Sequence, residues 1–282
     1  FWLKRPKAPG WSFECPRTRG MSKHRVDPDG RPPDRPLPSI GAGFAAGLAT
    51  TALLNPWDRA LYLSIVHRRS FFAKDNWRSP YRGLLQTLVQ RSVSSGLYFP
   101  LEERFAAALG SHALGGPAAG AMMALLLNPL SLIKYHTWGV TEERRWFMTT
   151  ARRLYRDAGP MVFARAAFSS ALRDATFGLC FGLRKHFPRA GGEPATPTQE
   201  FAAAIGCAAA GTALSSPFNY VRNMTYAEQS HVPLESFRSA YTFWRRVLGE
   251  LAKEAREHPT LRGRVSFLQG RLRLGWGTAR VA

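Results

Sequence analysis

The sequence is poor in cysteine and in acidic residues. Its three cysteines, Cys15, Cys180 and Cys207, are widely separated and form no CxxC pair. This spacing argues against a disulfide framework or a zinc site, and no metal site is expected. The 39 Lys and Arg residues outnumber the 19 Asp and Glu residues, which gives a formal charge of +20. Such a chain is expected to meet an anionic partner, and nucleic acid and anionic lipid are the two obvious choices.

Motifs of enzyme chemistry are missing as well. The sequence contains no GxGxxG, P-loop, HExxH or GxSxG motif, so we expect neither an enzyme nor a bound cofactor. Near its N-terminus it has no apolar run of the kind that forms a secretory signal. Residues 1–37 are instead rich in Pro, Arg and Lys. They are predicted to form a disordered basic extension.

Three apolar segments share one layout. Each has a small residue, a second small residue four positions later and a proline nine positions after that. The three sets are Gly43, Gly47 and Pro56; Gly116, Gly120 and Pro129; and Ala204, Ala208 and Pro217. Small residues at i and i+4 let helix backbones approach closely in lipid, and a proline inside a helix kinks it. The pattern therefore predicts three symmetry-related membrane helices with kinks at Pro56, Pro129 and Pro217.

Each apolar segment is followed by a basic connector and a second apolar helix. The second helices are expected at 81–103, 164–187 and 267–282. Equivalent positions near their starts are taken by Gly83, Ala166 and Gly270. The sequence thus predicts three αα units, each made of a long helix, a connector and a second helix, at residues 38–110, 111–190 and 196–282.

With these features the sequence resembles the mitochondrial carrier family. The odd helices of that family end in P-x-[DE]-x-x-[KR], and the segments that correspond here are 56–61, 129–134 and 217–222. Tyr81-Arg82-Gly83 matches the aromatic–basic–glycine triplet that opens the family's even helices. The resemblance covers residues 38–282. It implies an all-α membrane protein with six transmembrane helices, arranged as three pseudo-threefold helix-pair repeats around a central cavity. It also implies a multi-pass protein of the mitochondrial inner membrane that transports a small solute by alternating access.

The resemblance also implies a matrix-side gate made of ion pairs between the proline motifs. In the family, the acid of each motif pairs with the base of the next. The charged gate positions here are Asp58, Lys134 and Arg222. The other gate positions hold Leu61, Ser131 and Asn219. Asp58 with Lys134 is therefore the one expected pair, and the loss of the other two should weaken the closed gate.

Solute contact points follow from the same resemblance, seven and eight residues after each marker of an even helix. They are Gln90, Arg91, Arg173, Asp174, Gly277 and Thr278. Ionisable residues in a membrane span are costly and usually face a pore or a partner. We expect Arg91 and Arg173 to bind carboxylate or phosphate and Asp174 to meet an amine, which suggests a small carboxylate or amino-acid-like solute. The alternative is an internal Arg–Asp ion pair that touches no solute.

The basic residues concentrate in the long connectors on one side of the predicted membrane. The connectors are residues 68–78, 144–156 and 238–256. This is the positive-inside pattern. Anionic lipid, which is cardiolipin in the family, would bind part of this charge, and a solvated basic face is the alternative. An RNA-binding protein would explain the charge but not the three apolar repeats, so no nucleic-acid partner is expected.

Two departures from the family leave a second hypothesis open. The last helix, counted from Gly270, has 13 residues and would span about 20 Å of a hydrocarbon core of roughly 30 Å. It is therefore expected to be truncated. The eroded gate would fit a degenerate carrier that no longer transports and serves as a structural subunit of a mitochondrial membrane complex. A transporting carrier is expected to be a monomer.

Overall fold

The computed structural model describes residues 36–139, 147–184, 196–227 and 237–280. Across these residues every regular element is helical, in agreement with the predicted fold class. The described residues from 37 onward belong to one compact unit. The predicted extension 1–37 lies outside the described residues except for its last two positions, which begin the first helix.

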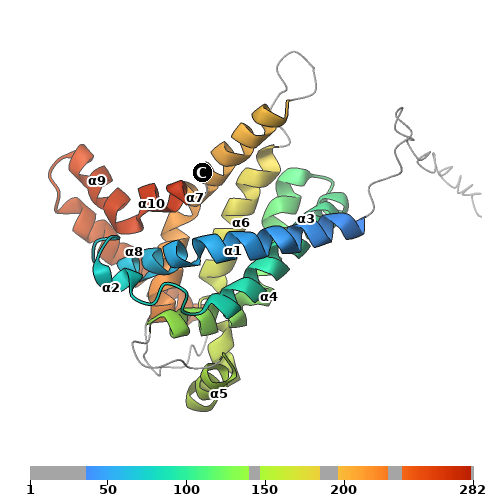
Figure 1. Ribbon diagram of the computed structural model, residues 1–282. Helices are drawn as coiled ribbons and strands as arrows, with labels where there is room; N and C mark the ends of the chain where they lie inside the picture. Colours follow the sequence, from blue (N-terminus) through green and yellow to red (C-terminus); the bar gives the residue numbers. More distant parts are fainter. Residues whose placement is uncertain (1–35, 140–146, 185–195, 228–236, 281–282) are drawn as a thin grey trace, which may run out of the picture. The chain divides into compact units, whose positions relative to one another are not determined.

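The helices follow the order long helix, connector, second helix three times. The long helices are α1 (Pro36–Val66), α4 (His112–Gly139) and α7 (Pro197–Ala227) (Figure 1). The second helices are α3 (Leu84–Leu109), α6 (Ala167–Arg184) and α10 (Leu274–Ala279). The connectors contain α2 (Lys74–Trp77), α5 (Phe147–Ala158), η1 (Pro160–Ala164), α8 (Phe237–Arg256) and α9 (Leu261–Leu272).

The motif prolines and small residues lie where the sequence predicts a special role. Pro56, Pro129 and Pro217 are each inside their long helix. A Cβ atom at Gly47 would lie 2.8 Å from the Ser92 Cα of α3. In α4, a Cβ atom at Gly120 would lie 2.2 Å from the Asp174 carbonyl oxygen of α6. The crossings of α1 with α3 and of α4 with α6 therefore require residues without side chains.

Two described segments are long and apolar enough to cross a membrane, Ala113–Gly139 in α4 and Thr198–Ala227 in α7. The sequence predicts six spans. Charged residues such as Arg91 in α3 and Asp174 in α6 lower the hydropathy of the second helices, and α10 holds only six residues. The helical architecture is therefore clear, while the six-span arrangement stays a prediction.

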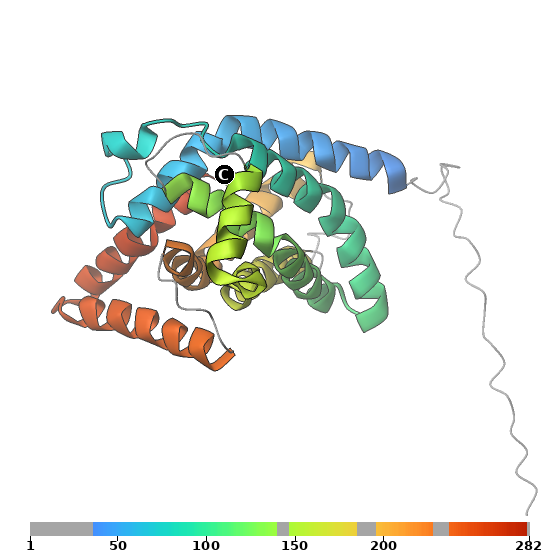
Figure 2. The same ribbon diagram turned by 90° about the horizontal axis from the view of Figure 1, so that it is seen from below.

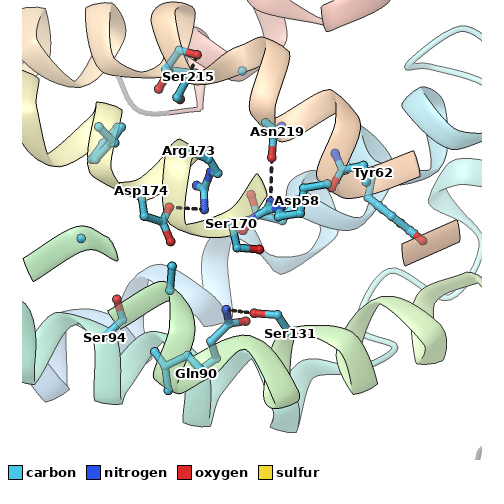
Figure 3. Close-up of a pocket in the computed structure, with 18 of the residues that line it drawn as sticks. Asp58, Tyr62, Gln90, Ser94, Ser131, Ser170, Arg173, Asp174, Ser215 and Asn219 are labelled. Carbon is cyan, nitrogen blue, oxygen red and sulfur yellow. Dashed lines mark hydrogen bonds and ion pairs between the residues drawn. The ribbon is translucent and has the colours of Figure 1, made fainter. Parts of the chain in front are cut away.

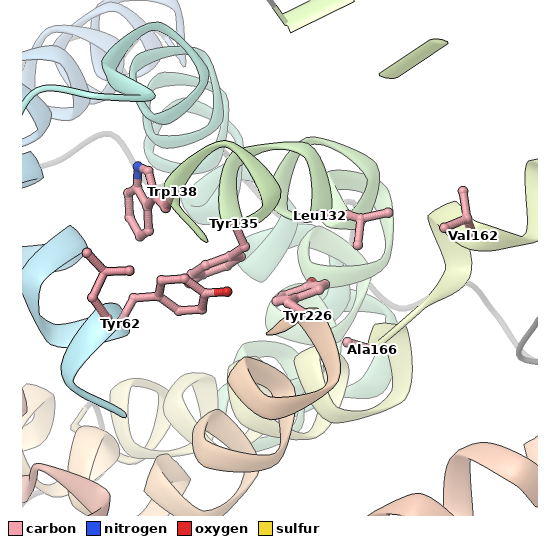
Figure 4. Close-up of a cluster of buried hydrophobic side chains, with 8 residues drawn as sticks. Tyr62, Leu132, Tyr135, Trp138, Val162, Ala166 and Tyr226 are labelled. Atoms are coloured by element: carbon pink, nitrogen blue, oxygen red, sulfur yellow. The ribbon is translucent and has the colours of Figure 1, made fainter. Parts of the chain in front are cut away.

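The C-terminal parts of the three long helices come together around buried tyrosines (Figure 4). Tyr62 of α1, Tyr135 of α4 and Tyr226 of α7 are all buried. The ring centroids of Tyr62 and Tyr135 are 4.6 Å apart, and those of Tyr135 and Tyr226 are 4.8 Å apart and stacked. The Tyr226 hydroxyl donates a hydrogen bond to the Asn128 side-chain oxygen at 2.7 Å. This cluster holds the three repeats together at one end of the helices.

The first and last repeats also contact each other directly. Figures 1 and 2 both place α10 beside the C-terminal half of α1. The Trp57 indole N–H donates to the Trp276 carbonyl oxygen at 3.1 Å, and the two rings are 5.8 Å apart. Phe71, from the connector after α1, stacks on Trp276 with a centroid distance of 4.9 Å. An aromatic cluster of Trp57, Phe71 and Trp276 thus joins the first repeat to the third.

Each second helix begins directly after a residue in the left-handed backbone conformation. These residues are Gly83 (φ 73°), Ala166 (φ 59°) and Arg273 (φ 55°). The first two are the markers that the sequence predicts, but the third marker, Gly270, lies inside α9. Helix α9 continues to Leu272, and the Arg273 N–H caps it by donating to the Gln269 carbonyl oxygen. The third repeat is therefore shifted by three residues from the predicted alignment.

Gly83 and Ala166 form a matched pair for testing this turn. Alanine at Gly83 would adopt an unfavourable φ, and its Cβ would lie 2.7 Å from the Trp138 Nε1. We expect Gly83→Ala to lower the free energy of unfolding by about 2 kcal/mol or more. Ala166→Gly should change it by less than about 1 kcal/mol, because relief of strain offsets the lost methyl contact. Thermal unfolding in detergent measures both, and equal destabilisation by the two variants would contradict the expectation.

Candidate functional site

A cavity of about 360 Å³ lies among the helices of all three repeats. Its lining residues come from α1, α3, α4, α6 and α7 and from the α9–α10 segment. Figure 3 shows side chains of α1, α3, α4, α6 and α7 around the same space. The volume is in the range of cavities that bind small metabolites. The cavity is therefore the candidate functional site.

Most residues that the sequence predicts for the site line this cavity. They are Asp58, Gln90, Arg91, Lys134, Arg173, Asp174, Arg222 and Gly277. Thr278 lies outside the lining, and its hydroxyl donates to the Leu274 carbonyl oxygen at 2.8 Å. The three-residue shift explains this difference. Counting seven residues from the left-handed positions gives Gln90, Arg173 and Arg280, so Arg280 takes the place that was predicted for Gly277.

Asp58 has other partners than the predicted one. Its carboxylate accepts hydrogen bonds from the Arg91 guanidinium at 3.1 Å and from the Arg280 guanidinium, one of whose two contacts is also 3.1 Å long. Asp58 and Lys134 therefore do not form the predicted ion pair in this structure. Lys134 instead donates to the Gln90 side-chain oxygen at 2.6 Å and lies 4.6 Å from the centre of the Tyr135 ring. A planar guanidinium group can donate two parallel hydrogen bonds to a carboxylate, which a lysine ammonium cannot do.

The other gate positions are joined by hydrogen bonds that involve neutral side chains. Gln90 accepts from Lys134 and donates to the Ser131 hydroxyl at 2.7 Å, so it bridges both motif positions of the second repeat (Figure 3). Arg222 donates to the Asn219 side-chain oxygen at 2.7 Å and to the Tyr135 hydroxyl at 2.8 Å. Amide and hydroxyl groups thus occupy the gate positions for which the resemblance to mitochondrial carriers predicts acids.

Arg173 and Asp174 form an ion pair with a distance of 2.6 Å between nitrogen and oxygen. This is the internal pair that the sequence leaves as an alternative to solute binding. Figure 3 shows both side chains at the cavity. Each keeps about a third of its side-chain surface exposed, 31% for Arg173 and 29% for Asp174. The pair can therefore also present hydrogen-bonding atoms to a solute.

The charge of the lining is strongly unbalanced. Among the described residues that line the cavity, two are acidic, Asp58 and Asp174, and six are basic. The basic residues are Arg91, Lys134, Arg173, Arg222, Arg273 and Arg280. The excess of four positive charges makes the cavity attractive to anions, because partly buried charges are weakly screened by salt. Serine hydroxyls from α3, α4, α6 and α7 add neutral hydrogen-bonding groups.

Two asparagines that were not predicted from the sequence connect the long helices to turns near the site. The Asn55 amide donates to the Pro80 carbonyl oxygen at 3.0 Å, and the Asn128 amide donates to the Phe163 and Arg165 carbonyl oxygens at 2.7 and 2.8 Å. Both asparagines precede a motif proline and connect their long helix to the turn before the second helix of the same repeat, α3 or α6. The repeated Asn–Pro dipeptide was a signal that could have found them.

Neither a comparison of the chain with protein-family models nor one with curated proteins finds a match.

Proposed function

We propose that this chain is a membrane carrier of the mitochondrial carrier type. It moves a small carboxylate or amino-acid-like metabolite across the mitochondrial inner membrane by alternating access. In this proposal the chain crosses the membrane six times, as three helix pairs, and the cavity of about 360 Å³ is the solute path. The transporting form is a monomer, and its partners are the solute and the surrounding lipid.

The observation that carries the proposal is the positive cavity that all three repeats line. Arg91 of α3, Arg173 of α6 and Arg280 directly after α10 come from the three repeats, and all three line one space. Arginine binds carboxylates through paired, charge-assisted hydrogen bonds. Charged groups inside a membrane protein are costly unless they meet a partner or a pathway. Asp58 and Asp174 pair with these three arginines but balance only part of the positive charge of the cavity. An anionic solute would balance more of it.

Anionic lipid is the second partner in this proposal. Helix α5 presents Arg152, Arg153 and Arg156 to its surroundings, together with the exposed side chains of Met148 and Tyr155. A helix with basic and apolar exposed residues suits the interface of a membrane that contains anionic lipid. Cardiolipin is the lipid that the family resemblance suggests.

A second candidate function is a non-transporting subunit of a mitochondrial membrane complex. The observation that favours it is the gate, where Ser131 and Asn219 stand in place of acids and Asp58 is bound by Arg91 and Arg280. Gate ion pairs that must break and form again are then largely missing. In this case the cavity charges would be satisfied internally, and no solute would move.

Reconstituted protein distinguishes the two functions. The full chain in liposomes of phosphatidylcholine, with and without cardiolipin, would be tested for uptake of labelled dicarboxylates, keto acids, amino acids, phosphate and nucleotides. Thermal unfolding over the same panel reports binding, because a ligand of the folded state raises stability by mass action. Saturable uptake of one anionic class supports the carrier. No uptake and no shift, from protein that migrates inside a larger native complex, supports the structural subunit.

A further inference from the structure

Asp58 is held by two guanidinium groups that come from different helices. Arg280 contacts both carboxylate oxygens of Asp58, and Arg91 contacts one of them at 3.1 Å. All three residues line the cavity. Two positive charges against one carboxylate leave this cluster with a net positive charge. A fork of guanidinium N–H groups around a carboxylate is also the geometry by which arginine would bind the carboxylate of a free solute.

The three residues of this cluster differ in their access to the cavity. The Arg91 side chain is 35% exposed, whereas those of Asp58 and Arg280 are 15% and 14% exposed. Arg91 is therefore the member that an incoming anion meets. If an anion binds the Arg91 guanidinium in place of Asp58, the Asp58 carboxylate keeps its two contacts with Arg280 and is not left as an unpaired charge. The exchange thus avoids the large cost of burying an isolated ion.

We propose that Asp58 is a built-in competitor for the anion site, and that the solute binds by replacing the Asp58 carboxylate at Arg91. This inference rests on the proposed function and names how the cavity selects its solute. A solute must carry a full negative charge to compete, and its binding loosens the Arg91 contact between α1 and α3. Asp58 thereby lowers the affinity for anions and ties their binding to a change in helix contacts.

The other repeats provide the matched residues for a test. The position of Asp58 is occupied by Ser131 in the second repeat and by Asn219 in the third. Asn219 accepts a hydrogen bond from Arg222 at 2.7 Å, so an asparagine at this position can still satisfy an arginine. Asp58→Asn therefore removes the competing charge and keeps the shape and a hydrogen-bond acceptor.

The experiment measures malonate binding to the full chain in detergent by calorimetry, at fixed low ionic strength. Asp58→Asn is expected to bind malonate about tenfold more tightly than the unaltered chain, which corresponds to about 1.4 kcal/mol. In an Arg91→Gln background, Asp58→Asn should raise malonate affinity less than about threefold, because the guanidinium that the loss of Asp58 makes available is missing. Asp174→Asn also removes one negative charge from the cavity. Its effect on malonate affinity should be the same in the otherwise unaltered chain and in the Arg91→Gln background.

The possible outcomes separate this inference from the proposed function. Malonate binding that Asp58→Asn leaves unchanged or weakens overturns the inference while the carrier stands. A full tenfold gain without Arg91 shows a general charge effect and also overturns it. If no variant binds malonate or moves any solute, the proposed function fails and the inference with it. Should Asp58→Asn not fold, Arg91→Gln alone decides, since at least about fivefold weaker binding is expected and unchanged binding refutes the exchange.

Discussion

Substituting Arg173 with alanine is expected to lower solute uptake at least about thirtyfold. Removing one partner of a buried, hydrogen-bonded charge interaction typically costs 2 kcal/mol or more, and 2 kcal/mol corresponds to that factor. Arg173 lies seven residues after the left-handed turn of the second repeat and lines the cavity. Its loss removes a guanidinium that would bind the solute carboxylate. Initial uptake rates into liposomes, over a range of solute concentrations, provide the measurement.

Two further variants separate solute binding from the internal ion pair. Arg173→Ala leaves Asp174 without its partner at 2.6 Å, so the single variant also loses stability. The double variant Arg173→Ala, Asp174→Asn removes both charges and avoids the unpaired carboxylate. If Arg173 binds solute, the double variant stays as inactive as the single one. If the two residues only stabilise each other, uptake returns, and that result would contradict the assignment.

An arginine outside the cavity provides the matched control. Arg262 of α9 has an exposed side chain and is not part of the cavity lining. Arg262→Ala removes the same charge from the chain without touching the cavity or the basic face of α5. We expect uptake within about twofold of the unaltered protein, because substitutions on an exposed surface usually change stability by less than about 0.5 kcal/mol. A comparable loss in both variants would point to a general effect of net charge.

The local features that the sequence predicts well are those set by backbone geometry. Gly47 and Gly120 lie at helix crossings where a Cβ does not fit, and Gly83 has a positive φ. A sequence carries such requirements directly, because few residues other than glycine meet them. The three prolines likewise mark the long helices. Repetition of these signals three times along the chain made the alignment of the helices possible.

The partners of charged side chains could not be predicted in the same way. Asp58 contacts Arg280, which is 222 positions away along the chain. That contact depends on the three-residue shift at Arg273, and arginine gives no sequence signal for a left-handed conformation. Lys134 has the basic side chain of the carrier motif that the sequence resembles. Its hydrogen bond nevertheless goes to Gln90 and not to Asp58. Motifs identify which residues face the cavity, whereas the pairing among them follows from side-chain length and direction.

A second large effect is expected on the helix crossing that supports the site. Gly120 of α4 packs directly on α6, where a Cβ would lie 2.2 Å from the Asp174 carbonyl oxygen. Gly120→Val must therefore push the two helices apart, at a cost of about 3 kcal/mol or more. Since α6 also carries Arg173, the displacement moves a guanidinium of the cavity. We expect a lower unfolding temperature and weaker solute binding in the same variant.

A glycine in open space shows whether this effect comes from the crossing. Gly206 lies inside α7, and a Cβ there would have no heavy atom within 4 Å. Gly206→Ala is expected to keep or raise the unfolding temperature, because alanine favours a helix by up to about 1 kcal/mol over glycine. Gly120→Ala should fall between Gly120→Val and the unaltered chain. If Gly120→Val unfolds at the temperature of Gly206→Ala, then α4 and α6 do not meet as closely as described, and the placement of Arg173 beside Asp58 and Gln90 in one cavity would lose its structural basis.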